Sequence, residues 1–263
     1  MFATDFMFNG QRASDFGLII CSFDGDFSVA SGGDIEFNVV KAPNRDRYTF
    51  YGAEFNNTLE WEFSIMKNTC YKEYDQNPFF NYGEERMVSK WLLKTDGYHW
   101  FRFINDEDDE IYYKVYINIT PHQIMGKTVG FDLIVTADCA YGFTDKIKKR
   151  FQIDKDNSYD LYIDTDISTY LLPKVKIIGV GDFFISNDSD ILQNQETGKA
   201  SEFKNVSDTI ILDSDNDIVK GLEPNDFNWY FLRLIDGKNV FSTDSANQID
   251  IELTYREARR VII

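Results

Sequence analysis

The chain has 263 residues, enough for two domains of ordinary size that can each bury a core without cross-links. Its formal net charge is −17, from 27 basic and 44 acidic side chains, and such a surface repels phosphate backbones, which argues against sequence-specific nucleic-acid binding. Only three cysteines are present, and the wide spacing of Cys21, Cys70 and Cys139 excludes a disulfide framework and a zinc-finger pattern.

No targeting or membrane-spanning segment is expected. The apolar stretch Leu18–Cys21 is shorter than the core of a signal peptide, and Asp5 and Asp15 precede it where a basic stretch would stand. No apolar run approaches the length of about 20 residues that a transmembrane helix needs. We therefore expect synthesis in a reducing cytoplasm, no signal peptide and no membrane insertion.

The first part of the chain alternates short strand-like segments with polar turns. Residues 2–9 and 16–23 are predicted as two strands joined by a turn that contains Asn9-Gly10, a pair that tolerates positive φ. Residues 35–40 and 59–65 alternate apolar and polar side chains. This period is typical of strands with one buried face and one wet face.

The segment between those last two strands, residues 42–52, mixes charged and aromatic side chains. It is predicted to form a loop or a projecting hairpin that contacts a partner. Four of its residues are the candidate oligomer interface: Arg45, Arg47, Tyr48 and Tyr51.

One helix is predicted, over residues 84–94. Acidic residues begin it, Lys94 lies near its end and Gly97 can close it. Four apolar side chains share one helical face and are expected to pack in the core: Met87, Val88, Trp91 and Leu92.

Residues 98–104 and 111–119 are predicted to form a long hairpin with an acidic tip at 105–110, and residues 127–138 are predicted to pair back onto it. The pattern then turns basic between Thr144 and Phe151. We place a domain boundary there, which predicts an N-terminal domain over residues 1–150 and a C-terminal domain over residues 151–263.

Short apolar runs closed by Asn, Asp or Gly punctuate the second domain, at residues 170–187, 209–216, 232–240 and 249–256. This pattern of short apolar runs that end in turn-forming residues predicts a sandwich of antiparallel strands. The predicted fold is therefore mainly β, with a sandwich-like or barrel-like N-terminal domain that carries one helix, followed by a C-terminal antiparallel β-sandwich.

The residues indicate no active site. The only histidines are His99 and His122, and a nucleophilic pair of His122 with Cys139 has no local signature to support it. Neither a Gly-x-Ser-x-Gly motif nor a phosphate-binding loop is present. We expect no catalytic residues, no cofactor and no metal site.

The acidic segment 213–217 has carboxylates at alternating positions, as a calcium loop begins. The EF-hand pattern then requires Gly and Glu at positions that Ile218 and Pro224 occupy here. A hairpin turn is the better interpretation of this segment.

Two other functional classes stay open. An exposed aromatic among Trp229 and Tyr230 could stack on a sugar ring in a carbohydrate-binding module, although burial in a strand is the simpler role for both. A polysaccharide hydrolase would need two facing carboxylates, and 44 acidic residues nominate no pair.

The order of several short sequence segments resembles that of one family, the distal tail (Dit) proteins of long-tailed bacteriophages, over nearly the whole chain. None of these segments is rare by itself, and the resemblance rests on their order and spacing. They are Phe6-Met7-Phe8-Asn9-Gly10, Asp15-Phe16-Gly17-Leu18, Lys90-Trp91-Leu92, the segment from Pro173 to Asn187, Ile211-Leu212-Asp213-Ser214 and Gly237-Lys238-Asn239.

The resemblance implies a galectin-like fold for the C-terminal sandwich and a structural role at the tail tip. Dit proteins form a homo-hexameric ring that connects the tail tube protein to a tail-associated hub protein and often holds receptor-binding proteins at its rim. DNA passes through the channel of the ring. The resemblance therefore implies a non-enzymatic virion component of a phage or prophage, located at the tail tip and involved in host adsorption.

Overall fold

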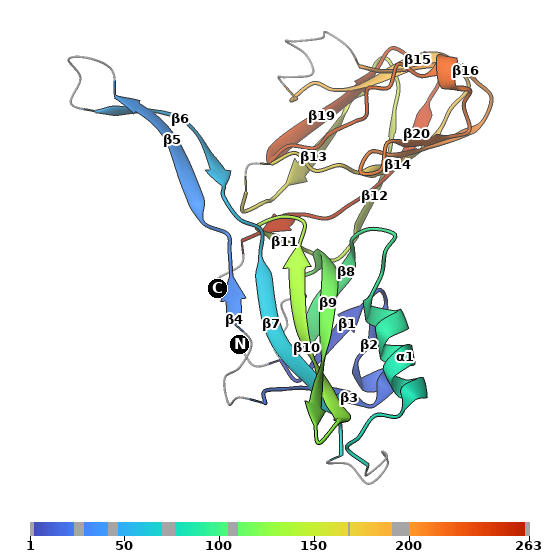
Figure 1. Cartoon of the computed structure of the whole chain (residues 1–263). Coiled ribbons are helices and arrows are strands. Elements are labelled where there is room, and N and C mark those ends of the chain that lie inside the picture. Colours follow the sequence, from blue (N-terminus) through green and yellow to red (C-terminus); the bar gives the residue numbers. More distant parts are fainter. Residues whose placement is uncertain are drawn as a thin grey trace. The chain divides into compact units, whose positions relative to one another are not determined.

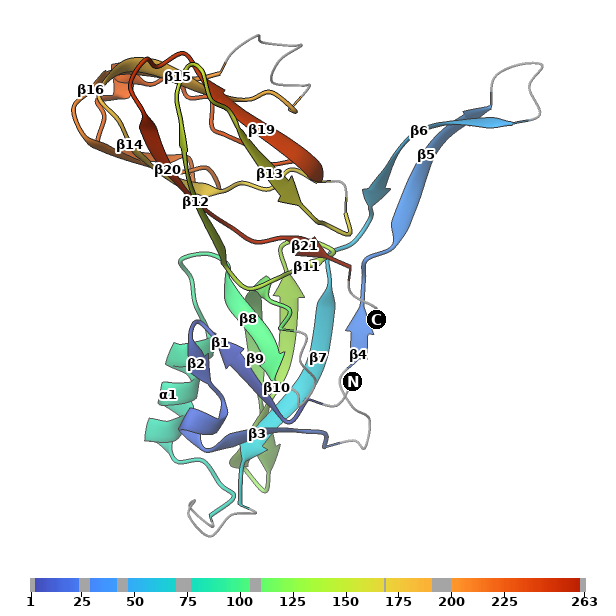
Figure 2. The same cartoon turned by 180° about the vertical axis from the view of Figure 1, so that it is seen from behind.

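The computed structural model describes residues 3–23, 29–41, 47–69, 77–104, 110–167, 169–190 and 200–260. The chain divides into two compact units, Met1–Gly142 with Val261–Ile263 (unit 1) and Phe143–Arg260 (unit 2). Figures 1 and 2 show the strands of both units from opposite sides. Cys70, Arg45 and most of the acidic tip at 105–110 lie outside the described residues.

Eight strands of unit 1 form one antiparallel sheet in the order β2-β1-β8-β9-β10-β7-β3, with β4 also paired to β7. The strands are β1 (Asp5–Phe8), β2 (Gln11–Arg12), β3 (Leu18–Cys21), β4 (Val29–Ser31), β7 (Glu60–Lys67), β8 (His99–Ile104), β9 (Tyr113–Ile124) and β10 (Lys127–Ala137). A 3-10 turn, η1 (Ser14–Phe16), precedes β3. The predicted hairpin of β8 with β9, and the return of β10 onto β9, are confirmed.

The sheet curls around an aromatic core. Phe6 on β1 and Phe63 on β7 are separated by three strands in the sheet order, yet their ring centroids lie 5.6 Å apart. The ring of Trp91, from the helix, stacks on Phe6 at 5.5 Å and donates its indole N–H to the carbonyl of Phe8 at 3.2 Å. One face of the curled sheet is therefore covered by the helix and is mostly apolar, with Lys67 as a buried polar residue on it.

The helix α1 (Tyr82–Leu92) begins two residues before the predicted start because of its cap. The Asn81 side chain accepts from the Glu84 amide at 3.1 Å, and the Glu84 carboxylate accepts from the Asn81 amide at 2.7 Å. Glu84 also pairs with Lys67 of β7 at 2.7 Å. Of the four predicted core residues, Val88, Trp91 and Leu92 are buried, whereas Met87 is exposed.

We expect Asn81→Ala to destabilise unit 1 by about 1 kcal/mol, because the substitution leaves the Glu84 amide without its side-chain acceptor. The free energy of unfolding from urea titration measures this loss. Asn118→Ala, which removes an exposed asparagine from β9, is the matched control and is expected to change the free energy by less than about 0.5 kcal/mol. Equal effects of the two substitutions would contradict the role of the cap.

Unit 2 is an antiparallel sandwich, as predicted, with one sheet in the order β12-β20-β14-β17-β18 and the other in the order β13-β19-β15-β16. Its elements are β11 (Gly142–Phe143), which spans the division between the units, β12 (Ile147–Ile153), β13 (Tyr159–Ile163), β14 (Lys174–Ile178), β15 (Gly181–Asn187), β16 (Ser201–Val206), β17 (Thr209–Asp213), β18 (Ile218–Lys220), η3 (Pro224–Asp226), β19 (Gly237–Thr243), β20 (Ile249–Tyr255) and β21 (Ala258–Arg259).

The division between the units differs from the predicted boundary at residue 150, which falls inside β12. The basic residues at which the boundary was placed, among them Lys148, Lys149 and Arg150, are exposed side chains of this strand. β12 is an edge strand, and lysines on edge strands hinder pairing with other chains. A run of basic residues in the sequence can therefore belong to an edge strand as well as to a domain boundary.

A network of buried polar side chains lies inside unit 2. Asn187 donates to the side-chain oxygen of Asn239 at 2.7 Å, and neither residue is exposed. Arg233 donates from Nε and Nη2 to the two carboxylate oxygens of Asp190 at 2.9 and 3.1 Å, and its guanidinium lies 4.1 Å from the centre of the Tyr170 ring. Asp190, Arg233 and Tyr170 all belong to unit 2.

Candidate assembly surface

Strands β5 (Ile35–Lys41) and β6 (Tyr48–Phe55) form a two-stranded sheet of their own within unit 1, which we call the arm. Figures 1 and 2 both show it as a separate hairpin. Its register pairs Ile35 with Phe55 and Val39 with Phe50, with a bulge between Asn38 and Val39. Every residue of β5 is exposed. Residues 48–52 therefore lie in a hairpin, one of the two alternatives predicted for residues 42–52, whereas residues 42–46 lie outside the described residues.

One face of the arm is apolar. Residues that lie opposite each other in an antiparallel pair share a face, and residues two apart on one strand share it too. Phe37 and Phe50 lie on this face with ring centroids 5.9 Å apart, and each side chain is 60% exposed. Six exposed large hydrophobic residues lie on this face, which we call the apolar face: Ile35, Phe37, Val39, Tyr48, Phe50 and Phe55. Lys41 lies at its end, opposite Tyr48.

The opposite face of the arm is mostly polar. Glu36 lies opposite Glu54, and Asn38 donates to the Glu54 carboxylate at 3.0 Å. The arm is thus amphipathic like a strand pair that covers a core. Its apolar side chains are nevertheless exposed, with the Tyr141 ring beside Phe55 at 6.2 Å at one end of the face. Isolated two-stranded hairpins are marginally stable in water, so the arm gains stability when a partner covers this face.

Three of the four predicted interface residues lie on or beside the arm. Tyr48 is on the apolar face, with the Lys41 ammonium 5.9 Å from its ring centre, Tyr51 lies at the bulge, and Arg47 immediately precedes β6. Arg45 lies outside the described residues. Phe37 and Phe50 were not among those four residues. Phe50 lies in the segment predicted to contact a partner, and the alternation over 35–40 was the signal that could have found Phe37.

The arm is anchored at its base by a glycine. Gly32, between β4 and β5, has φ of 105°, and a Cβ atom placed on it would lie 1.9 Å from the carbonyl oxygen of Thr58. Both the backbone conformation and the close approach to Thr58 therefore require glycine at this position.

Gly32→Ala is expected to destabilise unit 1 several times more than Gly10→Ala. Gly10 also has positive φ, but a Cβ on it would meet nothing within 4 Å, so its substitution costs only the left-handed conformation, about 1–2 kcal/mol. At Gly32 the backbone of Thr58 must move as well. Thermal unfolding of the two variants measures the difference, and equal losses would mean that the base of the arm is not held in this way.

The face of the eight-stranded sheet opposite the core carries a hydrogen-bonded polar group. Ser64 donates to Asp132 at 2.6 Å, and His122 Nδ1 lies 3.3 Å from the other oxygen of that carboxylate. Thr136 donates to Glu60 at 3.0 Å on the same face. We call these residues, together with Glu62, the polar face of the sheet.

The thiols of the described cysteines are protonated at neutral pH. Burial, with the Asp132 charge as a second cause, raises the pKa of Cys21 to about 11. Burial, followed by the charge of Asp138, raises the pKa of Cys139 to about 12. The Cys139 thiol donates to the Tyr141 carbonyl, whereas His122 contacts Asp132 and stacks on Phe23, so the pair considered from the sequence has other partners.

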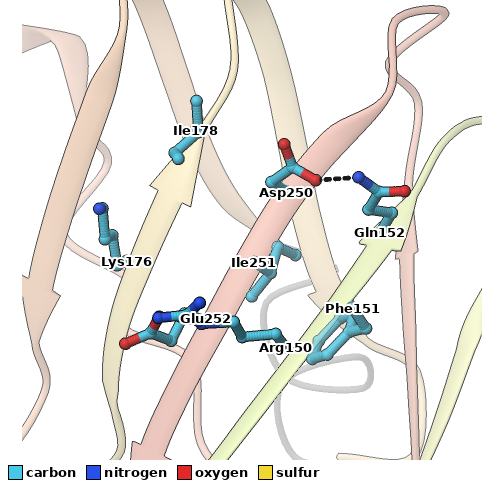
Figure 3. A pocket seen from close by; sticks show the side chains of 8 residues that line it. All are labelled: Arg150, Phe151, Gln152, Lys176, Ile178, Asp250, Ile251 and Glu252. Carbon is cyan, nitrogen blue, oxygen red and sulfur yellow. Dashed lines mark hydrogen bonds and ion pairs between the residues drawn. The ribbon is translucent and has the colours of Figure 1, made fainter.

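Unit 2 has an open hollow of about 520 Å³ over strands β12, β20 and β14. Figure 3 shows Gln152 beside Asp250 and Arg150 beside Glu252, each pair joined across neighbouring strands. Lys176 lies across from them on β14. The charged groups that line the hollow thus largely neutralise one another, as on a solvated sheet face.

Two further sequence candidates in unit 2 have clear positions. Residues 213–217 form the turn between β17 and β18, as expected, and Asn216 donates to Asp213 at 3.0 Å. Trp229 follows η3 in a loop and is exposed, whereas Tyr230 is partly buried. The simpler interpretation, burial of both in a strand, is therefore wrong, because neither residue lies in a strand and neither is fully buried.

Within the described part of the chain, no three His, Cys, Asp or Glu side chains are grouped in a way that could hold a metal ion. Among the same residues, no helix has the length and apolar character needed to cross a membrane.

Comparisons with known proteins identify the family. A family model described as "Phage tail protein N-terminal domain" matches residues 1–139, and one described as "Phage tail C-terminal domain" matches residues 141–255. No curated protein matches the chain.

Two solved structures share the fold. The Dit protein (gp 19.1) of phage SPP1, described as a paradigm of the hub adsorption apparatus of phages that infect Gram-positive bacteria, is 10% identical, with a TM-score of 0.52 over 97% of this chain and 99% of that chain. A chain of the phage p2 baseplate in its activated conformation with Sr is 12% identical, with a TM-score of 0.53 over 96% of this chain and 98% of that chain.

The two family models together cover most of the chain, and both solved structures are matched over nearly their whole length. The predicted mainly-β fold and the predicted resemblance to Dit proteins are confirmed. This chain belongs to a family of phage tail proteins and has the fold of a Dit protein.

Proposed function

We propose that this protein is a structural component of the tail tip, a homo-hexameric ring that connects the tail tube protein to a tail-associated hub protein. Such a ring holds its neighbours and catalyses no reaction. It is made in the host cytoplasm and functions in the virion, where receptor-binding proteins are further candidate partners at its rim. Membership of the phage tail family and the Dit fold support this role.

The exposed apolar face of the arm is the observation on individual residues that supports assembly into a ring. Six large hydrophobic side chains on one face of a hairpin are typical of an interface rather than of a monomer surface. In a closed ring, each copy presents one surface to the next copy and a different surface to the preceding copy. The arm, with Arg47, Tyr48 and Tyr51, is the surface that each copy extends to its neighbour.

The polar face of the sheet is the surface that we assign to the channel. Its carboxylates, Glu60, Glu62 and Asp132, would repel the phosphates of passing DNA, so that DNA moves through without binding. A map of the assembled ring checks this assignment. A channel lined by basic side chains would contradict it.

The mass in solution, measured by light scattering after size exclusion, tests the ring. We expect a species near 184 kDa, six times the 30.6 kDa of one chain, with sixfold rings in negative-stain images. Mixing the protein with the tail tube and hub proteins of the same phage is the second measurement, because a weak ring closes only with its neighbours. Failure to form rings in both measurements would contradict the proposal.

A further inference from the structure

Trp229 presents a large aromatic surface in unit 2 to solvent. Its side chain is 53% exposed, in the loop that follows η3 (Pro224–Asp226). Trp61 and Trp91 are buried in unit 1, where their rings pack against other aromatic rings. An indole in water forgoes the free energy that burial would give, so its exposure calls for a reason other than stability.

The backbone of Trp229 is in the left-handed conformation, with φ of 62°. For a residue with a Cβ this conformation costs about 1–2 kcal/mol, and glycine or asparagine normally occupies it. The side chain is only half buried, against the rings of Phe227 and Phe231. Backbone strain of this kind clusters at binding sites, where the surrounding structure holds a side chain in place.

The loop holds the indole ring in one position. Its N–H donates to the Pro224 carbonyl at 3.2 Å. The neighbouring Asn228 accepts from the Glu202 amide at 3.1 Å and donates to the Ala200 carbonyl at 2.8 Å, which ties the loop to β16. The ring is therefore fixed before any ligand arrives.

A row of aromatic rings connects Trp229 to the core of the sandwich. The rings of Phe183 and Phe203 are buried with centroids 5.2 Å apart, Phe203 stacks on Phe227 at 5.3 Å, and Phe227 lies 6.0 Å from Trp229. The row runs from the core of the sandwich to the surface, so that the exposed indole ends a rigid column.

The chemistry around the ring selects the class of ligand. The indole N–H is already bonded, so the ring offers a ligand only its electron-rich face, which packs well against C–H groups. Exposed Glu223 and Asn225, with Asp226 beside them, supply acceptors for hydroxyl groups. The net charge of −17 disfavours phosphate-bearing and other anionic ligands.

A pyranose ring combines a C–H face with hydroxyl groups at its edge. We propose that Trp229 is the stacking platform of a binding site for a neutral saccharide, formed by the loop of η3. A protein partner would require a wider apolar surface around its anchor, whereas Glu223 and Asn225, which flank Pro224, are polar and exposed. The site lies within unit 2 and is independent of the ring.

Calorimetric titration of the full chain with maltohexaose and with chitohexaose tests the site. We expect at least one of the two sugars to bind, and Trp229→Asn to weaken that binding at least tenfold. Asparagine accepts the left-handed backbone, so this variant is expected to keep its urea unfolding midpoint. Trp229→Phe, which keeps a smaller ring, should lose less affinity, and it serves as the test variant if Trp229→Asn does not fold.

Tyr162→Ala is the matched control, because Tyr162 is an aromatic side chain of β13 that is 75% exposed. Its affinity should stay within twofold of that of the unaltered chain. Absence of binding to both sugars, or equal binding by the folded Trp229→Asn variant, would overturn the proposal. Binding of decaproline in place of the sugars would overturn it too, because the loop would then be a protein-docking site.

Discussion

Replacing Phe37 and Phe50 together by aspartate is expected to abolish assembly of the ring while unit 1 stays folded. Both rings lie on the apolar face of the arm and both are 60% exposed, so their removal leaves the core unchanged. If a neighbouring copy covers this face, each substitution places a charge in a desolvated contact and costs about 2 kcal/mol or more. We expect association to weaken at least about a hundredfold.

The control for this pair uses the same strands and the same added charge on the opposite face. Val40 lies opposite Thr49 in the register, and neither belongs to the apolar face. Val40→Asp with Thr49→Asp should therefore leave the ring intact. Light scattering of the two double variants gives the answer, and a ring that survives the loss of Phe37 and Phe50 would exclude the apolar face as the interface.

Asp190→Ala is expected to destabilise unit 2 by about 3 kcal/mol, although Asp190 is far from any proposed interface residue in the sequence. The Asp190 carboxylate has no exposed surface, and Arg233, which is 29% exposed, makes two hydrogen bonds to it. Removal of one partner leaves the other as a largely buried charge without compensation. The free energy of unfolding from a urea titration measures this loss.

Asp160→Ala provides the comparison. Asp160 pairs with Lys238 at 2.8 Å, but both side chains are about 60% exposed, and exposed pairs contribute less than about 1 kcal/mol. Replacing Asp190 and Arg233 together by Leu and Met should recover part of the loss, because no unpaired charge then remains. Equal losses for Asp190→Ala and Asp160→Ala would show that burial adds nothing to the inner pair.

Much of the fold follows from local sequence patterns. The alternation over 59–65 and the two halves of the hairpin around the acidic tip predicted β7, β8 and β9, because a period of two assigns side chains to the faces of a strand. The turn at 213–217 and the sandwich of unit 2 followed from their Asn, Asp and Gly residues. The family resemblance, too, came from the order of such segments.

Local patterns did not predict the structure where the same residue types are compatible with two different structures. The basic residues near Arg150 suggested a domain boundary and belong to an edge strand. Asn187 and Asp190 are polar residues in the sequence, and they bond to Asn239 and Arg233, which lie more than 40 residues further along the chain. Partners at such distances in the sequence leave no local signal.

The arm shows most clearly what the sequence by itself determined and what only the tertiary structure decided. Residues 35–40 and 59–65 alternate in the same manner, and in both cases the alternation determined a strand with one apolar face. The apolar side chains of β7 are covered by the core, whereas those of β5 remain in solvent. The period of a pattern fixes which side chains share a face, but whether that face is covered depends on what distant parts of the chain, or another copy of it, place against it.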